Sequence, residues 1–127
     1  MPRILLVDDD DLFRTMLRRK LVNLGHEVRE ARNGKEAEKS FEQETPDLVI
    51  TDLVMPEKEG LETIRDLRRR HPGVRIIAMS GGGRIDPLDY LQIAKAMGAA
   101  RVLPKPFADE DLVEAIEEVL TPPFGGQ

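Results

Sequence analysis

Side chains able to bind a cation and a phosphate stand at four separate places in this 127-residue chain. Four consecutive aspartates occupy residues 8–11, and Asp52, Ser80 and Lys105 each follow an apolar run. Carboxylates brought within a few ångströms repel one another, and Mg²⁺, which prefers oxygen ligands, relieves that repulsion. Lys105 would add a positive charge and Ser80 a hydrogen-bond donor. Together these groups suit phosphoryl transfer onto an aspartate, because that reaction depends on positioning and charge neutralisation.

The elements that must position these groups alternate between short apolar strands and amphipathic helices. Strands are predicted at 4–7, 26–31, 48–50, 74–79 and 101–103, and helices at 11–24, 35–44, 60–71, 87–97 and 109–120. The inward face predicted for the first helix comprises Phe13, Leu17, Leu21 and Leu24. Asp10 and Asp11 are interpreted as caps of that helix, and Asp109 as the cap of the last one.

Alternating strands and helices predict an α/β fold with a parallel sheet covered by helices on both faces. The first, third and fourth strands are the most apolar and should be central. The second strand is more polar, and the fifth ends at Pro104, so both suit the edges of the sheet. This favours a flavodoxin-like, doubly wound, five-stranded sheet in the order 2-1-3-4-5, with five helices. Sites in such sheets lie at the carboxyl ends of the strands, so Asp8, Asp9 and Asp52 should converge.

Four motifs in this order resemble the receiver domain of two-component response regulators. They are Val7-Asp8-Asp9, then Asp52-Leu53-Val54-Met55-Pro56 with Gly60, then Ser80, and then Lys105-Pro106-Phe107. Each motif alone is weak, but four in order, each at the end of a predicted strand, are a strong signal. The resemblance covers residue 3 to about residue 120, so we expect a receiver domain at 1–120 and a C-terminal tail at 121–127.

The resemblance implies a role for each motif. The implied site residues are Asp52 as phosphoacceptor, Asp9, Asp52 and the carbonyl of Val54 as Mg²⁺ ligands, Asp8 as holder of a metal-bound water, and Ser80 and Lys105 as ligands of the phosphoryl oxygens. It also implies a cis peptide bond between Lys105 and Pro106. The expected chemistry is limited to the chain's own phosphorylation and dephosphorylation, so no enzyme activity on a separate substrate is expected.

The resemblance further implies the partners. The expected phosphoryl donor is a phosphohistidine on a sensor histidine kinase or on a histidine phosphotransfer protein. Phosphorylation is expected to shift a two-state equilibrium and so change the binding of a partner protein or the pairing of two copies. The sequence leaves open the kinase, the downstream target, the lifetime of the phosphoryl group, the oligomeric state, and whether the domain stands alone or is linked to an output domain.

Three features depart from the common receiver pattern. Val102 stands where many members carry tyrosine or phenylalanine, so an aromatic rotamer change cannot transmit the signal here. The glycine-rich segment 81–89 is longer than usual and is expected to move on phosphorylation. Lys105 stands between two prolines and is expected to be held stiffly. Val54 and Gly82 offer no side chain that could orient a water, so strong assistance to self-hydrolysis is not expected.

An enzymatic alternative uses some of the same residues. Phosphatases of the haloacid dehalogenase type also place Asp-x-Asp after a first strand, followed later by Ser or Thr and by Lys. Asp8 as nucleophile, with Asp10, Ser80 and Lys105, fits that pattern. This hypothesis leaves Asp52 with Met55-Pro56 unexplained and lacks a cap domain.

Composition excludes several other classes of protein. The chain has no cysteine, which excludes a thiolate metal site and suits a reducing compartment. Its formal net charge of -5 disfavours direct nucleic-acid binding, and the basic cluster at residues 65–71 is interpreted as a solvated helix face. No apolar run approaches the roughly 20 residues that span a bilayer. We therefore expect a cytoplasmic protein without membrane contact.

Overall fold

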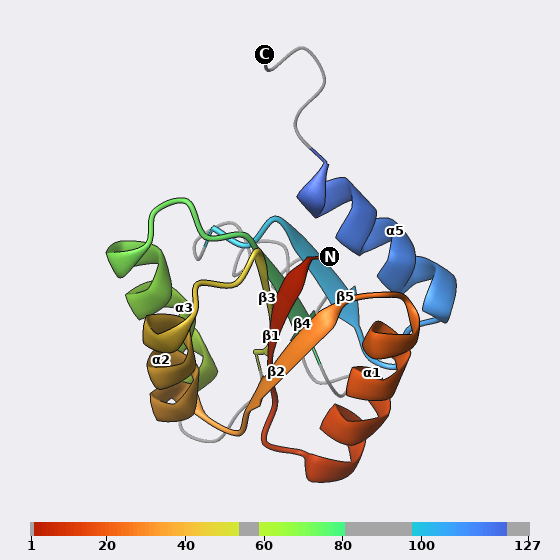
Figure 1. Ribbon diagram of the computed structural model, residues 1–127, viewed down its shortest axis with the longest axis horizontal. Helices are drawn as coiled ribbons and strands as arrows, with labels where there is room; N and C mark the ends of the chain where they lie inside the picture. The colour runs from red at the N-terminus through yellow and green to blue at the C-terminus, as the bar shows by residue number, and fades with distance from the viewer. Residues whose placement is uncertain (1, 54–58, 81–97, 122–127) are drawn as a thin grey trace.

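Five parallel strands form one sheet in the order β2-β1-β3-β4-β5 in the computed structural model, which describes residues 2–53, 59–80 and 98–121 (Figure 1). The strands are β1 (Arg3–Val7), β2 (Glu27–Ala31), β3 (Leu48–Asp52), β4 (Ile76–Ser80) and β5 (Arg101–Pro104). The helices described are α1 (Asp11–Asn23), α2 (Gly34–Gln43), α3 (Glu59–Arg70) and α5 (Asp109–Leu120). The predicted flavodoxin-like order is confirmed. The fifth predicted helix, at 87–97, lies outside the described residues.

Helices cover both faces of the sheet, α1 and α5 on one face and α2 and α3 on the other (Figure 1). Successive strand residues point to opposite faces, so one apolar run serves two cores. Ile4 and Leu6 join the cluster under α1 and α5, whereas Leu5 and Val7 join the cluster under α2 and α3. This explains why the strand sequences lack polar alternation.

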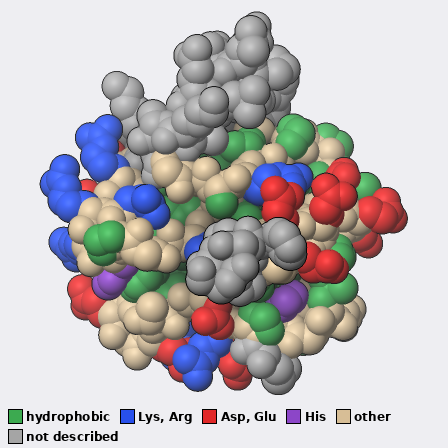
Figure 2. All heavy atoms as spheres, turned by 90° about the horizontal axis from the view of Figure 1, so that it is seen from above, with side chains coloured by type: hydrophobic (Ala, Val, Ile, Leu, Met, Phe, Trp, Pro, Cys, Tyr) green, Lys and Arg blue, Asp and Glu red, His purple; other side chains and the backbone are tan. Residues whose placement is uncertain are grey.

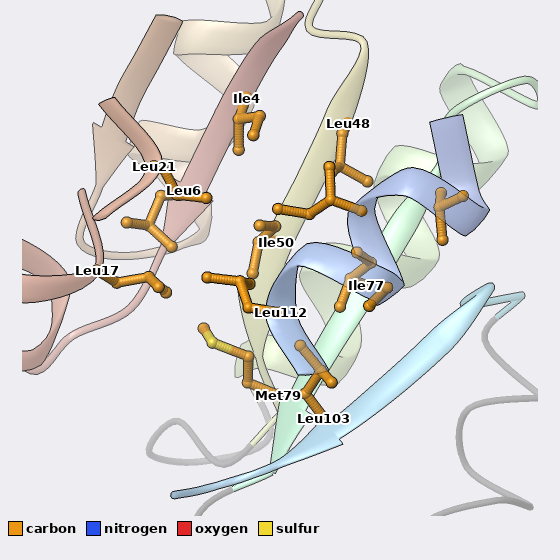
Figure 3. Packing of buried hydrophobic residues seen from close by; sticks show 13 residues of the cluster. Ile4, Leu6, Leu17, Leu21, Leu48, Ile50, Ile77, Met79, Leu103 and Leu112 are labelled. Carbon is orange, nitrogen blue, oxygen red and sulfur yellow. The ribbon is translucent and has the colours of Figure 1, made fainter. Parts of the chain in front are cut away.

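The cluster under α1 and α5 fixes both helices against the central strands. Figure 3 shows Leu17 of α1 and Leu112 of α5 near Ile50 and Met79 of the sheet. All four side chains are almost fully buried. The cluster therefore holds α1, whose first residue is the last aspartate of the run, in a fixed place relative to β3 and β4.

The amino end of α1 follows the sequence prediction in part. The carboxylate of Asp10 accepts a hydrogen bond of 3.1 Å from the backbone nitrogen of Phe13, so Asp10 is the N-cap. Asp11 is instead the first helical residue, and its carboxylate accepts a hydrogen bond from Arg14 at 2.8 Å. The interpretation of Asp11 as a cap is therefore wrong.

Two other predictions about helix ends are wrong. Asp109 does not cap α5, because Ala108 occupies the N-cap position and Asp109 forms an ion pair with Lys20 of α1 at 2.8 Å. Leu24 does not point inward, because α1 ends at Asn23 and leaves Leu24 47% exposed at the C-cap. At Asp109 the carboxylate pairs with another helix instead of capping its own, and at Leu24 the end of the helix leaves the side chain in solvent.

The surface is unevenly charged. Figure 2 shows lysine and arginine side chains gathered on the side of α2 and α3, and acidic side chains on the side of α5. Arg65, Arg69 and Arg70 of α3 are exposed, whereas Arg68 donates hydrogen bonds to the carbonyl oxygens of Pro72 and Val74 at 3.0 and 3.1 Å. The end of α3 is thus a solvated basic face, as the sequence predicts. None of the described helices combines the length and the apolarity needed to cross a membrane.

Candidate functional site

The ends of β1 and β3 lie side by side, and this arrangement brings three carboxylates together. Val7 and Thr51 pair in register, so Asp8 and Asp52 follow them on neighbouring strands. One carboxylate oxygen from each of Asp8, Asp9 and Asp52 can be chosen so that all three lie within 4.8 Å of one another. Asp8 and Asp52 are buried and Asp9 is exposed. The structure therefore places these aspartates where the strand order leads one to expect them.

Lys105 extends from the end of β5 to both buried carboxylates. Its Nζ atom lies 2.9 Å from Oδ2 of Asp8 and 3.2 Å from Oδ2 of Asp52. The peptide bond to Pro106 is cis, as predicted. Burial lowers the pKa of Lys105, but the hydrogen bond to Asp8 and the charge of Asp52 outweigh burial and leave this pKa raised. The side chain is therefore a positively charged ammonium group at neutral pH.

Ser80 ends β4 beside Lys105. The backbone nitrogen of Lys105 donates a 2.7 Å hydrogen bond to the carbonyl oxygen of Ser80, which fixes the two residues next to each other. Ser80 is 1% exposed, and its hydroxyl has no hydrogen-bond partner among the residues that the structure describes. A buried hydroxyl of this kind is costly unless a ligand satisfies it. A phosphoryl oxygen would provide the missing acceptor.

The donor set suits a hard divalent cation. Mg²⁺ usually takes one or two protein carboxylates together with waters and phosphate oxygens, and the group of Asp8, Asp9 and Asp52 offers only oxygen. The carbonyl of Val54, the fourth predicted metal ligand, lies outside the described residues. The same holds for Met55-Pro56 and for the glycine-rich segment at 81–89. Among the described residues, the fit to Mg²⁺ therefore depends on the three carboxylates, and their oxygen atoms suit this ion.

Sequence reasoning missed Arg14, which binds the backbone beside the carboxylates. Arg14 is buried, and its Nη1 donates to the carbonyl oxygen of Asp8 at 2.7 Å. Its Nε donates to Glu30 at 3.0 Å and its Nη2 to Asp11 at 2.8 Å. Burial lowers the pKa of Arg14, but these two carboxylates outweigh it and leave the pKa raised. Its position three residues before Leu17 places it on the buried side of α1, and this spacing was the sequence signal that could have identified Arg14 as a buried residue.

The role of Phe13 was also missed, because the sequence identified it only as a core position. The Nζ atom of Lys105 lies 4.0 Å from the centre of the Phe13 ring. The rings of Phe13 and Phe107 are 6.2 Å apart at an angle of 88°, an edge-to-face contact. The ring of Phe13 therefore lies against the ammonium group, and Phe107 packs against that ring.

Comparison with known proteins gives matches over nearly the whole chain. Residues 4–117 match the family model of the response regulator receiver domain. The chemotaxis protein CheY of Thermotoga maritima is 36% identical over 118 residues, which make up 92% of this chain and 96% of that protein. The DNA-binding transcriptional regulator NtrC of Azospirillum brasilense is 39% identical over an alignment of 123 residues that covers 94% of this chain. This chain spans only 25% of the length of that regulator.

A solved structure agrees with these matches. The chemotaxis protein CheY4 of Vibrio cholerae superposes with a TM-score of 0.85 at 31% identity, covering 94% of this chain and 99% of that one. Neither the family match nor these relatives support the alternative assignment as a phosphatase with Asp8 as nucleophile.

Proposed function

This chain belongs to the response regulator receiver domains, which are phosphorylation-activated signalling domains, and we propose that Asp52 is its phosphoacceptor. The observation that supports this choice is the place of Asp52 at the carboxyl end of β3, within the group of three carboxylates, where it is 5% exposed while Asp8 is fully buried. Asp8 is less suited to attack phosphorus. It is fully buried, its Oδ1 accepts a hydrogen bond from the backbone nitrogen of Asp10, and its Oδ2 accepts one from Lys105.

The proposed transfer is a single displacement at phosphorus. A carboxylate oxygen of Asp52 forms a bond to phosphorus while the bond from phosphorus to the donor histidine nitrogen breaks, and that nitrogen keeps the electron pair. Lys105 and the hydroxyl of Ser80 donate hydrogen bonds to the phosphoryl oxygens. Mg²⁺ held by Asp8, Asp9, Asp52 and the carbonyl of Val54 would offset the negative charge on those oxygens. Later hydrolysis of the acyl phosphate restores the carboxylate.

Receiver domains are signalling domains rather than ordinary enzymes, and response regulators receive their phosphoryl group from histidine kinases. We propose that a sensor histidine kinase or a histidine phosphotransfer protein is the donor here, and that the domain comprises residues 1–120 with a tail at 121–127. The relatives include a short chemotaxis protein and a much longer regulator, so the output can pass to a separate protein, to a linked domain or through homodimerisation. We place this activity in the cytoplasm.

Phosphorylation by a small donor tests the assignment. Incubation with acetyl phosphate and Mg²⁺ should add the mass of one phosphoryl group to the intact chain, and Asp52→Asn should abolish that addition. Asp47→Asn is the matched control, because Asp47 lies at the opposite end of β3 and should leave phosphorylation intact. An unmodified Asp52 would contradict the proposal. Turnover of p-nitrophenyl phosphate that is lost in Asp8→Asn but kept in Asp52→Asn would support the phosphatase instead.

A further inference from the structure

The geometry around Lys105 points to Phe13 as a positioning residue for phosphoryl transfer: we propose that its ring face supports the ammonium group and thereby raises the rate at which Asp52 is phosphorylated. The inference rests on the proposed function of Asp52. It assigns Phe13 a role that acts through Lys105 rather than through a direct contact with the phosphoryl group.

Three contacts surround the ammonium group. Nζ donates to Asp8 at 2.9 Å and to Asp52 at 3.2 Å, and the centre of the Phe13 ring lies 4.0 Å away. A cation within about 6 Å of a ring centre is attracted by the negative face of the ring, more strongly when water is excluded. The Lys105 side chain is only 16% exposed, so this attraction is little screened.

The ring has an advantage over a polar neighbour at this place. An ammonium group has three N–H donors, and two are used by Asp8 and Asp52. A carboxylate in place of the ring would take the third donor in a strong hydrogen bond and compete with an incoming phosphoryl oxygen. An aromatic face stabilises the charge without such a bond. The third donor of Lys105 therefore remains available for the phosphoryl group.

The ring is itself held in place from two directions. The backbone nitrogen of Phe13 donates to Asp10 at 3.1 Å, which ties the first turn of α1 to the aspartate run. The edge-to-face contact with Phe107 fixes the ring plane, and both rings pack against the buried cluster under α1 and α5. Phe107 and Lys105 belong to the same segment after β5, so that segment and α1 hold the cation and the ring together.

A graded change in the ring separates this role from simple packing. Phenylalanine analogues with one, two and three ring fluorines, placed at position 13, weaken the attraction for a cation while nearly preserving the ring size. The rate constant for phosphorylation by acetyl phosphate should fall at each step, by roughly ten-fold over the series. The same series at Phe41, which is buried on the other face of the sheet, should leave the rate unchanged.

A second measurement needs neither metal nor phosphoryl group. In Mg²⁺-free buffer, Phe13→Leu should reduce the folding equilibrium constant roughly two- to five-fold more when Lys105 is present than in the Lys105→Met background. If Phe13→Leu changes the folding equilibrium constant equally in both backgrounds, or if ring fluorination leaves the phosphorylation rate unchanged, the proposed role of Phe13 is wrong. Either result would leave the assignment of Asp52 intact. A wild-type chain that takes no phosphoryl group on Asp52 would instead contradict the proposed function itself.

Discussion

The guanidinium group of Arg14 donates a 2.7 Å hydrogen bond to the backbone carbonyl oxygen of Asp8. The same group binds Asp11 at the start of α1 and Glu30 on β2, so one buried side chain joins three elements beside the proposed metal site. The turn that carries Asp8 and Asp9 is therefore held by a side chain that, being a guanidinium group, cannot itself be a ligand in the proposed metal site. The affinity for Mg²⁺ should depend on Arg14 for this reason.

Arg14→Met should lower the free energy of unfolding by about 2–3 kcal/mol, because the Asp8 carbonyl and the Glu30 carboxylate both lose a charged partner. It should also weaken Mg²⁺ binding several-fold, as measured by titration calorimetry. Arg14→Lys keeps the charge but cannot reach three acceptors at once, so it should recover only part of both quantities. Arg18→Met is the control, because Arg18 contacts Glu30 from a half-exposed position at 3.4 Å. Unchanged Mg²⁺ affinity in Arg14→Met would mean that Arg14 only stabilises the fold.

Ser80→Ala should separate the stability of the resting chain from the binding of a phosphoryl group. The hydroxyl is buried without a partner among the described residues, so its removal should leave the free energy of unfolding unchanged or raise it by up to about 1 kcal/mol. With Mg²⁺ and beryllofluoride, a stand-in for the phosphoryl group, the affinity should fall by about five- to ten-fold. Both quantities can be measured by urea unfolding and by titration calorimetry.

Ser40→Ala, on α2, provides the matched control for Ser80 and should leave the beryllofluoride affinity as it is in the wild type. A Ser80→Ala variant that binds beryllofluoride as tightly as the wild type would remove Ser80 from the proposed site. A loss of several kcal/mol in the resting chain would show that the hydroxyl already has a partner.

The order of the strands could be predicted from the sequence because the polarity of each strand reflects whether it is central or at an edge of the sheet. β3 and β4 are buried at every residue, whereas β2 is largely exposed, and these patterns separate central from edge strands. The positions of Asp52, Ser80 and Lys105 followed because each stands at the carboxyl end of a strand. For residues at strand ends, the strand order alone predicts that they lie together at the carboxyl edge of the sheet.

Residues whose roles depend on contacts across the fold could not be found in this way. Helical spacing assigns Phe13 to an inward face but does not say that the ammonium group of Lys105 will lie over its ring. Aspartate is a common N-cap residue, yet the carboxylate of Asp109 forms an ion pair with Lys20 of another helix. Local patterns therefore give faces and ends of elements, and the pairing of side chains between elements requires the packed structure.

Asp9→Asn should make the metal-free chain more stable and the metal-bound chain less so. Asp9 is the exposed member of the carboxylate group, and removing its charge relieves repulsion from Asp8 and Asp52, which we expect to stabilise the chain by on the order of 1 kcal/mol in the presence of a chelator. The stability of the wild type should rise with Mg²⁺ concentration, because a ligand that binds only the folded state stabilises it. The variant should lose most of that dependence.

Urea unfolding with a chelator and at increasing Mg²⁺ concentration measures both effects of Asp9→Asn. Asp111→Asn removes a similarly exposed carboxylate from the first turn of α5 and should keep the full Mg²⁺ dependence. If Mg²⁺ stabilises Asp9→Asn as strongly as the wild type, Asp9 is not a ligand.

His26 gives the chain a pH dependence unconnected with the carboxylates. It precedes β2, and its Nδ1 atom is buried without a hydrogen-bond partner in the described part of the chain. Burial, with a smaller contribution from the positive N-terminus, lowers the pKa of His26 below its usual 6.5. The unfolded chain therefore takes up a proton at a higher pH than the folded chain does.

The sign of the effect follows from proton linkage. Above about pH 7 His26 is mostly neutral in both states and contributes almost nothing, whereas below its unfolded pKa the unfolded state is protonated first and the free energy of unfolding falls. The fall should level off once the pH is below the folded pKa. Urea unfolding between about pH 7.5 and 5.5 should show this decline in the wild type, and His26→Phe should flatten it. His71→Gln retains His26 and should keep the decline, while an equal decline in His26→Phe would mean that other groups cause it.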